Sequence, residues 1–382
     1  MKVTAIRTVH LGAPADAQAK LDRNWTFVIV EADGGISGLG ECTLSYMEGA
    51  VSAVVDRLGQ ILVGQDPTRV EHLWQQMYRR PFWRGGVVMS AAMSGIDQAL
   101  WDIAGKNAGL PVYRMLGGPV RDRIRCYARA DLTGTQLEQA VAVKKQGFTG
   151  FKLSPEPDYG TISEEELVAS AIETARSVRE AVGPEMALMM DFHGRLSPAG
   201  AVRCLSGLKP YNFLFAEELI PPDNVPAYAE VTAAVPETAT ATGERLYTRW
   251  GFRELIERRA VRIIQPDICY AGGISELRRI AAHAETHYMQ VSPHNPNGPV
   301  AMAASIHLAA ATPNFIILEH ARKPPYFEKA LRKPLVLRDG HFELPTAPGL
   351  GVELDEDFVR QHPMHVVPIA SAWNPDGSVA DV

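Results

Sequence analysis

The pattern of apolar and polar residues divides the chain into two parts. In the first part, WTFVIVEADG and GISGLGE alternate as two strands around a turn at Asp33–Gly35, and an Asp-Gly pair there is typical of a hairpin. The N-terminal run MKVTAIRTVHL is expected to form an earlier strand. Apolar residues at helical spacing predict helices over residues 49–64, 68–80 and 89–109. This mixture predicts a small α+β domain over residues 1–122.

From residue 123 onward, short β-rich runs alternate with amphipathic helical stretches such as Glu165–Ala181 and Ile274–Thr286. The eight β-rich runs are RIRCYARA, FTGFKLS, MALMMDFH, FLFAEEL, TATATGE, VRIIQPD, YMQVSPH and FIILEH. Eight β/α units in roughly 200 residues are typical of a TIM barrel, and a doubly wound sheet rarely has so many. We therefore predict an α/β fold with a modified (β/α)7β TIM-like barrel over residues 123–344. The loop-rich residues 345–382 would return to the α+β domain.

Composition narrows the class of protein. The chain has 382 residues, 46% of them hydrophobic and 21% charged, as in a globular protein with more than one core. A net charge of −6 argues against a nucleic-acid partner, which would need a basic face. The four cysteines form no C-x-x-C pair, no signal peptide is evident, and no apolar run is long enough to span a membrane. We expect a cytoplasmic protein with a small-molecule partner.

Polar side chains end six successive strands of the predicted barrel. They are Asp191 with His193, Glu217, Glu244, Asp267, His294 and Glu319, spaced 23 to 27 residues apart. Each step matches one β/α unit, so all of these groups should emerge at the C-terminal mouth of the barrel, where barrel enzymes carry out their chemistry.

Three of these residues, Asp191, Glu217 and Glu244, are carboxylates on neighbouring strands. Like charges at one place repel and raise each other's pKa unless something compensates them. A hard divalent cation does so, and Mg²⁺ prefers oxygen ligands. The all-oxygen set argues against zinc, which prefers nitrogen and sulfur. The sequence therefore predicts a magnesium site.

The remaining strand-end groups are suited to proton transfer. A carboxylate beside an imidazole orients it and raises its basicity, so Asp267 and His294 are candidates for a general acid–base pair, although a purely structural pair has the same pattern. His193 lies two residues after Asp191 and would face the same side if the strand continued, which makes it a second proton-transfer candidate. Glu319 would hydrogen-bond a developing enediolate if protonated, or orient a neighbouring group.

Several longer runs resemble the enolase superfamily, mandelate racemase subgroup, over nearly the whole chain. These runs are GQDPTRVEHLWQQMYR, SGIDQALWDIAGK, LMMDFHGR, FAEEL, TGER, IIQPDICYAGGISEL, SPHNPNGPVA, PGLGVELDE and SAWNPDGSVADV. The resemblance implies that the small domain caps the barrel and selects the substrate, while the barrel supplies the chemistry. It also implies a homo-oligomer, and it implies that the three carboxylates bind Mg²⁺.

Carried over residue by residue, the resemblance implies further roles. His294, paired with Asp267, would move the proton at C2 of a sugar acid. His193 would act as the acid that helps the 3-hydroxyl group depart, and Glu319 would lie near a substrate carboxylate oxygen.

One departure from the family bears on the type of reaction. Lys152 matches the first position of the K-x-K motif of the racemases, but Ser154 stands where their second lysine would be. Loss of that lysine disfavours two-base racemisation and suits a dehydratase, which needs one base and one acid. The resemblance therefore implies a hydro-lyase that converts a sugar acid to a 2-keto-3-deoxy acid.

Other functions stay open at this stage. An epimerase, racemase or cycloisomerase could use the same metal site, with His193 as a second base. A barrel that only binds a sugar acid is a further alternative, and a sugar aldolase would need a catalytic lysine and a phosphate site. The runs EEL, ILEHARKPPYF, LSYMEG and GAPADAQAKLDRN differ from the family pattern, so the particular sugar acid and its stereochemistry are not predicted.

Overall fold

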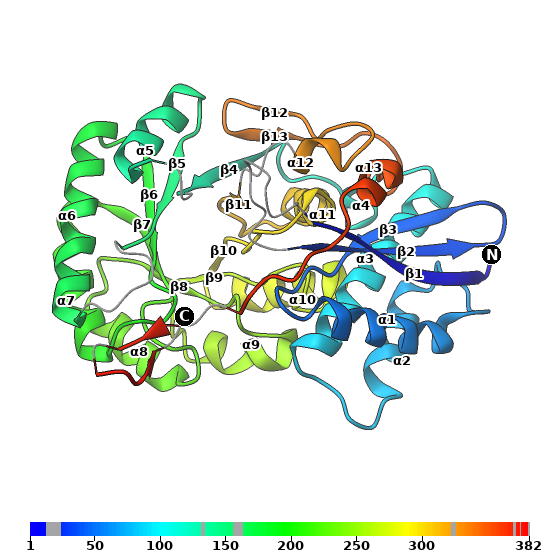
Figure 1. Cartoon of the computed structure of the whole chain (residues 1–382), viewed down its shortest axis with the longest axis horizontal. Coiled ribbons are helices and arrows are strands. Elements are labelled where there is room, and N and C mark those ends of the chain that lie inside the picture. Colours follow the sequence, from blue (N-terminus) through cyan, green and yellow to red (C-terminus); the bar gives the residue numbers. More distant parts are fainter. Residues whose placement is uncertain are drawn as a thin grey trace.

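A computed structural model of the chain describes residues 1–12, 24–130, 134–155, 163–321, 326–369, 372–374 and 376–380. Most of the divergent run GAPADAQAKLDRN and four residues of ILEHARKPPYF lie outside these ranges. In Figure 1 the N-terminal unit lies at one end of the long axis of the molecule, and the helices α6, α7 and α8 of the barrel lie at the other. Among the described residues, no helix has both the length and the apolar character needed to cross a membrane.

The N-terminal unit is an antiparallel sheet covered by helices. Its strands are β1 (Val3–Leu11), β2 (Trp25–Ala32) and β3 (Ser37–Glu41), and its helices are α1 (Glu48–Leu62), α2 (Val70–Arg79), α3 (Val87–Ala108) and α4 (Val112–Met115). The predicted hairpin and the three predicted helices are confirmed. Strand β3 packs closely on α3, since a Cβ atom on Gly40 would lie 2.0 Å from the carbonyl oxygen of Gly95. Gly109 ends α3 in the left-handed conformation, as its position in the sequence predicted.

The larger unit is a closed barrel. Within the described residues its eight strands are β4 (Arg123–Arg129), β5 (Gly150–Leu153), β6 (Ala187–Asp191), β7 (Phe213–Glu217), β8 (Thr240–Thr242), β9 (Ile263–Ile264), β10 (Gln290–Val291) and β11 (Leu318–His320). Neighbouring strands from β4 to β10 pair in parallel, and β11 pairs with β4. A parallel bridge between Val291 and Phe315 completes the ring. The prediction of eight barrel strands is confirmed.

One helix follows each barrel strand from β4 to β10. The seven helices are α5 (Gln136–Lys145), α6 (Glu164–Val182), α7 (Pro198–Leu208), α8 (Val225–Ala234), α9 (Thr248–Glu257), α10 (Gly273–Glu285) and α11 (Pro299–Ala310), with a short 3₁₀ turn, η1 (Lys209–Tyr211), after α7. Capping boxes at Thr135 and Ser163 begin α5 and α6, because each side chain accepts a hydrogen bond from the backbone N–H of a glutamate three residues on. Over the described residues this order is the (β/α)7β arrangement predicted from the sequence.

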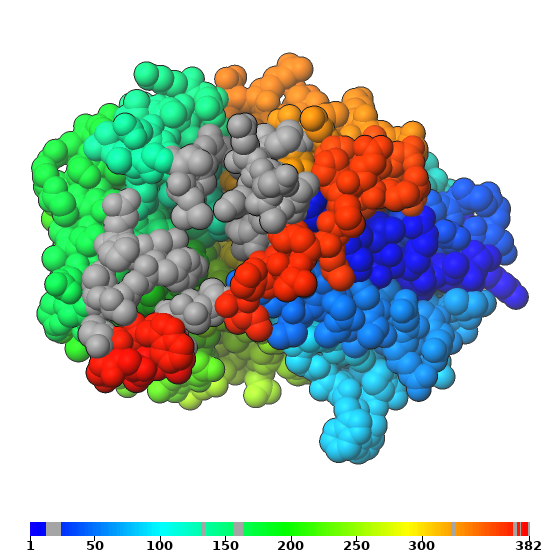
Figure 2. Space-filling model, viewed as in Figure 1, coloured from blue at the N-terminus to red at the C-terminus, as the bar shows by residue number. Residues whose placement is uncertain are grey.

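Two features after the barrel strands were not predicted. Past the short helix α12 (Tyr326–Lys329), the strands β12 (Leu337–Arg338) and β13 (His341–Glu343) form a hairpin, and β13 pairs antiparallel with the beginning of β4. The last residues, expected to be loop-rich, include the helix α13 (Glu356–Gln361) and a hairpin of β14 (Ala372–Trp373) and β15 (Val379–Ala380). In Figures 1 and 2 this last hairpin, in red, lies toward the barrel end of the molecule.

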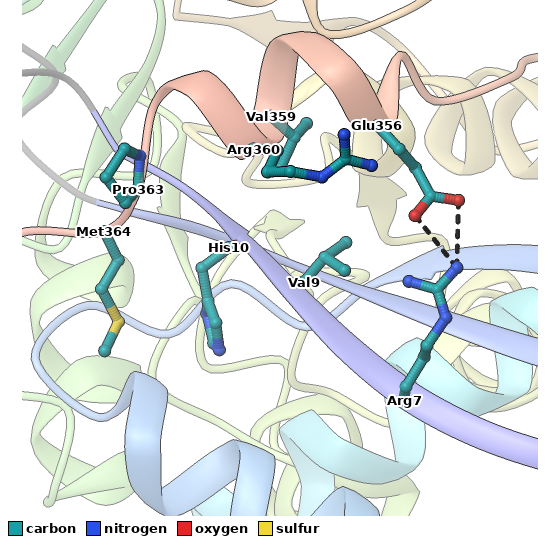
Figure 3. Close-up of a pocket in the computed structure, with 8 residues that line it drawn as sticks. All are labelled: Arg7, Val9, His10, Glu356, Val359, Arg360, Pro363 and Met364. Carbon is teal, nitrogen blue, oxygen red and sulfur yellow. Dashed lines mark hydrogen bonds and ion pairs between the residues drawn. The ribbon is translucent and has the colours of Figure 1, made fainter.

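The C-terminal segment returns to the N-terminal unit through α13. Arg7 of β1 forms an ion pair with Glu356 at 3.0 Å, and the backbone N–H of Gly12 donates to the carbonyl oxygen of His362 at 2.9 Å. Between β1 and this segment lies a cavity of about 640 Å³ (Figure 3), lined by Arg7, Val9, His10, Glu356, Val359, Arg360, Pro363 and Met364. None of the predicted site residues lines it. These contacts agree with the expected return of residues 345–382 to the capping domain, and the division at residues 122 and 344 stays a prediction.

Candidate active site

The alternation of side chains along the barrel strands explains why two of the strand-end carboxylates, Asp191 and Glu217, meet. On β6, Met189 belongs to the apolar cluster inside the barrel, while Met190 packs outward with the helices. Asp191, two residues after Met189, therefore points inward at the top of the strand. Glu217 follows the inward-facing Phe215 of β7 in the same way. The apolar cluster fills the barrel below these carboxylates and excludes water from beneath them.

Asp191, Glu217 and Glu244 form a group whose carboxylate oxygens lie within 4.8 Å of one another. Asp191 and Glu217 are buried and Glu244 is partly buried. The buried Oε2 atom of Glu244 accepts no hydrogen bond from any residue that the structure describes. Three converging oxygen donors, one of them without a hydrogen-bond partner, form a set that suits a hard divalent cation. The residues present therefore fit the metal that the sequence predicted.

Lys152 of β5 lies among these carboxylates. Its Nζ atom is 3.1 Å from Oδ2 of Asp191, 2.9 Å from Oε2 of Glu217 and 3.2 Å from Oε1 of Glu319. Burial lowers the pKa of Lys152, but these three carboxylates outweigh burial and raise it well above the ordinary value. The ammonium group is thus charged and serves as the counter-ion that allows the carboxylates to approach one another.

One lysine does not balance all of the negative charge. Burial and the charge of Asp191 raise the pKa of Glu217 to about 8. Burial also raises the pKa of Asp191, but His193 and Lys152 lower it well below the ordinary value. A raised pKa beside an ionised neighbour shows that the group still lacks positive charge. This deficit is a second, electrostatic indication of a cation site.

The predicted pair of Asp267 and His294 is formed. Oδ2 of Asp267 lies 2.7 Å from Nδ1 of His294, and Nε2 of the same ring lies 3.3 Å from Oε2 of Glu244. Burial lowers the pKa of His294, but Glu244, Asp267 and Glu319 together raise it to about 10. One nitrogen of the imidazole is therefore held by Asp267, while the other faces the carboxylate group.

His193 reaches the site by a different route from the one predicted. Strand β6 ends at Asp191, and His193 adopts a left-handed backbone with φ of 49°, so the expected continuation of the strand is wrong. Its Nε2 atom nevertheless lies 3.3 Å from Oδ2 of Asp191. The charge of Asp191 raises the pKa of His193 to about 9 in spite of burial. The turn, and not the pleat of a strand, brings this imidazole to the barrel mouth.

Glu319 of β11 lies on the side of Lys152. The backbone N–H of Asn295 donates to its Oε2 at 2.9 Å. Burial raises the pKa of Glu319, but Lys152, His294 and Arg129 lower it to about 2. Of the two roles considered from the sequence, orientation of neighbouring groups by an ionised carboxylate fits these contacts better than donation by a protonated one.

Sequence reasoning missed two side chains that contact the histidine–aspartate pair. The hydroxyl group of Tyr270 lies 2.9 Å from Nδ1 of His294, and Nδ2 of Asn297 donates to both oxygens of Asp267 at 3.1 and 2.8 Å. Each lies three residues after a predicted site residue, in the QPDICY and SPHNPN runs. Spacing within a loop does not show where a side chain points, so only the three-dimensional structure identifies them.

A second ion pair borders the carboxylate group. Arg245 donates to both oxygens of Glu218, from Nε at 2.9 Å and from Nη2 at 2.8 Å. Burial and Glu244 raise the pKa of Glu218 to about 7, although Arg245 opposes this effect. Each residue directly follows a strand-end carboxylate in the sequence, so the pair ties together the loops that carry Glu217 and Glu244.

A barrel whose mouth combines a cation-binding carboxylate group with a histidine–aspartate pair belongs to the class of metal-dependent acid–base enzymes. The sequence comparisons give the family. The model "Mandelate racemase / muconate lactonizing enzyme, N-terminal domain" matches residues 5–117, and the model "Enolase C-terminal domain-like" matches residues 136–358. The chain therefore belongs to the enolase superfamily, mandelate racemase subgroup, which confirms the resemblance seen in its sequence motifs.

Individual relatives match over the full length. The chain is 37% identical to D-galactonate dehydratase of Ralstonia pickettii and 36% identical to that of Pectobacterium atrosepticum, covering 100% of each protein and of this chain. Among solved structures, an enolase of Agrobacterium radiobacter matches with a TM-score of 0.90 and 34% identity over 100% of both chains. That enolase is a candidate galactarate dehydratase and was solved with sodium and L-malate bound.

Proposed function

We propose that this protein is a Mg²⁺-dependent hydro-lyase that dehydrates a sugar acid of the D-galactonate kind. The observation that carries the proposal is the junction between the two parts of the site, where Nε2 of His294 lies 3.3 Å from Oε2 of Glu244. An acid–base imidazole and a cation-binding carboxylate thus meet at one point. The full-length similarity to D-galactonate dehydratases supports a sugar-acid substrate.

The chemical difficulty is the low acidity of a C–H bond next to a carboxylate. Asp191, Glu217 and Glu244 would hold Mg²⁺, which when bound would supply positive charge beside the substrate carboxylate. Lys152 keeps Asp191 and Glu217 together beneath that position. Stabilisation of charge that develops only in the transition state raises the rate, whereas equal binding of substrate and transition state does not.

Proton transfers are assigned to the two histidines. In the basic form, His294 holds a proton on Nδ1 against Asp267 and takes the C2 proton at Nε2, so that Asp267 stabilises the resulting imidazolium. His193 gives its proton to the 3-hydroxyl group, which leaves as water. The enol that remains takes up a proton at C3 and loses the proton of its 2-hydroxyl group, which gives the 2-keto-3-deoxy acid. Each histidine is expected to contribute roughly 10²- to 10⁴-fold.

The same arrangement bears on the alternative reactions. Ser154 replaces the second lysine of the racemase motif, and Lys152 is engaged with three carboxylates. Neither residue is placed to act as a second base. This leaves one base and one acid, which is the requirement of elimination.

We also propose that the protein is a cytoplasmic homo-oligomer, as implied by its family and by its lack of a disulfide pattern.

A screen of stereochemically complete aldonic and aldaric acids with Mg²⁺ tests the function. A dehydratase yields an α-keto acid that semicarbazide traps, and D-galactonate is the first substrate to try. An epimerase or racemase would give no semicarbazone but would exchange or invert C2. A cycloisomerase would give an isomer without a ketone, and a binding protein would show a ligand-dependent rise in melting temperature without turnover.

A further inference from the structure

We propose that Glu41, in the N-terminal unit, is a positioning residue for the base of the barrel. Glu41 holds the beginning of α11 in place and, through Asn297, fixes the orientation of Asp267 and His294. This inference rests on the proposed function, in which His294 removes the C2 proton. It assigns to the capping domain a part in proton transfer, in addition to any contact with substrate.

Glu41 is the last residue of β3 and is fully buried. Its Oε1 accepts hydrogen bonds from the backbone N–H of Gly298 at 2.7 Å and from the Thr43 hydroxyl at 2.7 Å, and its Oε2 accepts from the N–H of Ala301 at 2.8 Å. Gly298 directly precedes α11. The first N–H groups of a helix have no partner within the helix, and a carboxylate there is favoured by the helix dipole. A side chain of one domain thus caps a helix of the other.

The approach of Glu41 to the helix is unusually close. A Cβ atom on Gly298 would lie 2.8 Å from both carboxylate oxygens of Glu41, a separation that side chains do not tolerate. Only glycine at this position allows the carboxylate to reach the backbone. The contact therefore holds the beginning of α11 directly against the Glu41 carboxylate.

The loop before α11 connects the Glu41 contact to His294, the proposed base. Asn297 is adjacent to Gly298, and its side-chain Nδ2 donates to both oxygens of Asp267 at 3.1 and 2.8 Å. Asp267 in turn lies 2.7 Å from Nδ1 of His294. Any shift in the beginning of α11 moves Asn297 and thereby the carboxylate that orients the imidazole.

A second connection links the same two segments. Nε2 of Gln98, on α3, donates to the carbonyl oxygens of Glu41 at 2.8 Å and of Ile268 at 3.0 Å, and its Oε1 accepts from the N–H of Glu41 at 3.1 Å. Ile268 follows Asp267 directly in the sequence. Glu41 and Asp267 are therefore joined both through the loop before α11 and through Gln98, and both connections are buried.

The simplest alternative is that Glu41 only stabilises the contact between the two domains. Asp97 provides a matched control, because it is another buried carboxylate of the N-terminal unit that contacts a helix of the barrel. It accepts from the N–H and hydroxyl of Ser275 in α10 at 3.0 and 2.6 Å. Among the described residues it has no hydrogen bond to Asp267, Asn297 or His294. Loss of Asp97 should therefore affect stability without affecting the base.

The test compares Glu41→Gln with Asp97→Asn in the full-length protein. In Glu41→Gln an amide NH₂ group would face a backbone N–H, so the beginning of α11 must shift. We expect kcat to fall about 10- to 100-fold, as for a displacement of roughly 1 Å at a reacting group. KM and Mg²⁺ affinity should change less than about twofold, and C2-proton exchange should slow by the same factor as keto-acid formation. Asp97→Asn should lower the melting temperature and leave kcat unchanged.

A double-mutant cycle tests the path through Asn297. If Glu41 acts through Asn297, the effects of Glu41→Gln and Asn297→Ala on kcat should be clearly less than additive. The milder variant Thr43→Val, which removes one hydrogen bond to Glu41, provides a folded substitute if Glu41→Gln does not fold, and it should slow exchange a few-fold. The inference is overturned by additive effects, by an unchanged kcat in folded Glu41→Gln or Thr43→Val, or by an equal loss in Asp97→Asn.

Failure of the proposed function would be recognised separately, because the wild-type protein would then neither exchange C2 protons nor dehydrate any sugar acid. In that case the Nδ1 proton resonance of His294, in protein labelled with ¹⁵N-histidine, replaces the kinetic measurement. Glu41→Gln should move this resonance and Asp97→Asn should not. An unmoved resonance in Glu41→Gln would overturn the inference independently of any substrate.

Discussion

The Nε2 atom of His294 lies 3.3 Å from the Oε2 atom of Glu244, while Nδ1 of the same ring lies 2.7 Å from Asp267. One imidazole thus joins the carboxylates proposed to bind the cation to the aspartate behind it. Because the ring is buried and Nδ1 is held by Asp267, the imidazole is fixed with Nε2 facing Glu244.

Replacement of His294 by Asn should abolish exchange of the C2 proton in deuterated water and abolish keto-acid formation. Asn cannot accept and hold a proton at neutral pH, but it preserves a polar group of similar size. Mg²⁺ binding, measured by calorimetry, should persist within a few-fold. Exchange at the wild-type rate in His294→Asn would show that another residue is the base.

Replacement of Lys152 by Met should destabilise the metal-free protein more than the metal-loaded one. Without Lys152, the buried carboxylates of Asp191, Glu217 and Glu319 lose their counter-charge. The loss of one partner of a buried ion pair costs roughly 3–5 kcal/mol of unfolding free energy. Urea unfolding with EDTA and with saturating Mg²⁺ measures the difference, since a bound cation should restore part of this loss.

Lys106→Met is the matched control for Lys152. Lys106 pairs with the buried Asp102 at 2.7 Å, on α3. Its replacement should destabilise the protein to the same extent with and without Mg²⁺. If Mg²⁺ relieved the two variants equally, Lys152 would not be a counter-ion of the metal site.

Replacement of Tyr270 by Phe should reduce kcat about 2- to 10-fold, the range expected for one hydrogen bond, with little change in KM. The phenol oxygen lies 2.9 Å from Nδ1 of His294, so it helps Asp267 to fix the ring. Tyr228→Phe is the comparison, because its hydroxyl group donates to the carbonyl oxygen of Ile220 and lies outside the histidine–aspartate pair. Steady-state kinetics should show a lower kcat for the first variant alone; equal rates in both would remove Tyr270 from the account.

Acidification should destabilise the fold through His307. Burial lowers the pKa of His307 to about 4, although its hydrogen bond to the Leu350 carbonyl opposes the shift. Since the folded pKa lies below the unfolded value of about 6.5, the unfolded state binds the proton more readily. The contribution of His307 is complete above about pH 6.5 and is lost as the pH falls toward 4, by about 2 kcal/mol between pH 7 and pH 5.

Urea unfolding at several pH values measures this effect. His307→Gln should flatten the dependence on pH, whereas the control His287→Gln, at a partly exposed position after α10, should not. An equally steep dependence in His307→Gln would contradict the assignment.

Much of the site was predictable because barrel strands follow simple rules. Alternation places Asp191 and Glu217, and the spacing of one strand-end group per β/α unit was enough to predict that Glu244 joins them. Glu244 itself lies past the end of β8, out of step with the inward-facing Ala241. The contacts of Asn297, Tyr270 and Glu41 were not predictable, since they depend on how loops and a second domain pack. His193 is an exception to strand alternation, because a left-handed turn after β6 brings it to the site.

The fold likewise has elements that the sequence predicts and elements that depend on tertiary contacts. Regular elements of the barrel have their own pattern of apolar residues, and they were predicted. The short strands β12 and β13 form because β13 pairs antiparallel with the beginning of β4. This pairing is a tertiary contact. Likewise, α13 is only six residues long and packs on β1 through Arg7 and Glu356.

The most direct test of the account is a crystal of the protein soaked in Mn²⁺, with anomalous scattering recorded at the manganese edge. We predict one strong peak bounded by carboxylate oxygens of Asp191, Glu217 and Glu244, with His294 beside it. If the three carboxylates face apart, or the ion binds elsewhere, the proposed chemistry has no basis.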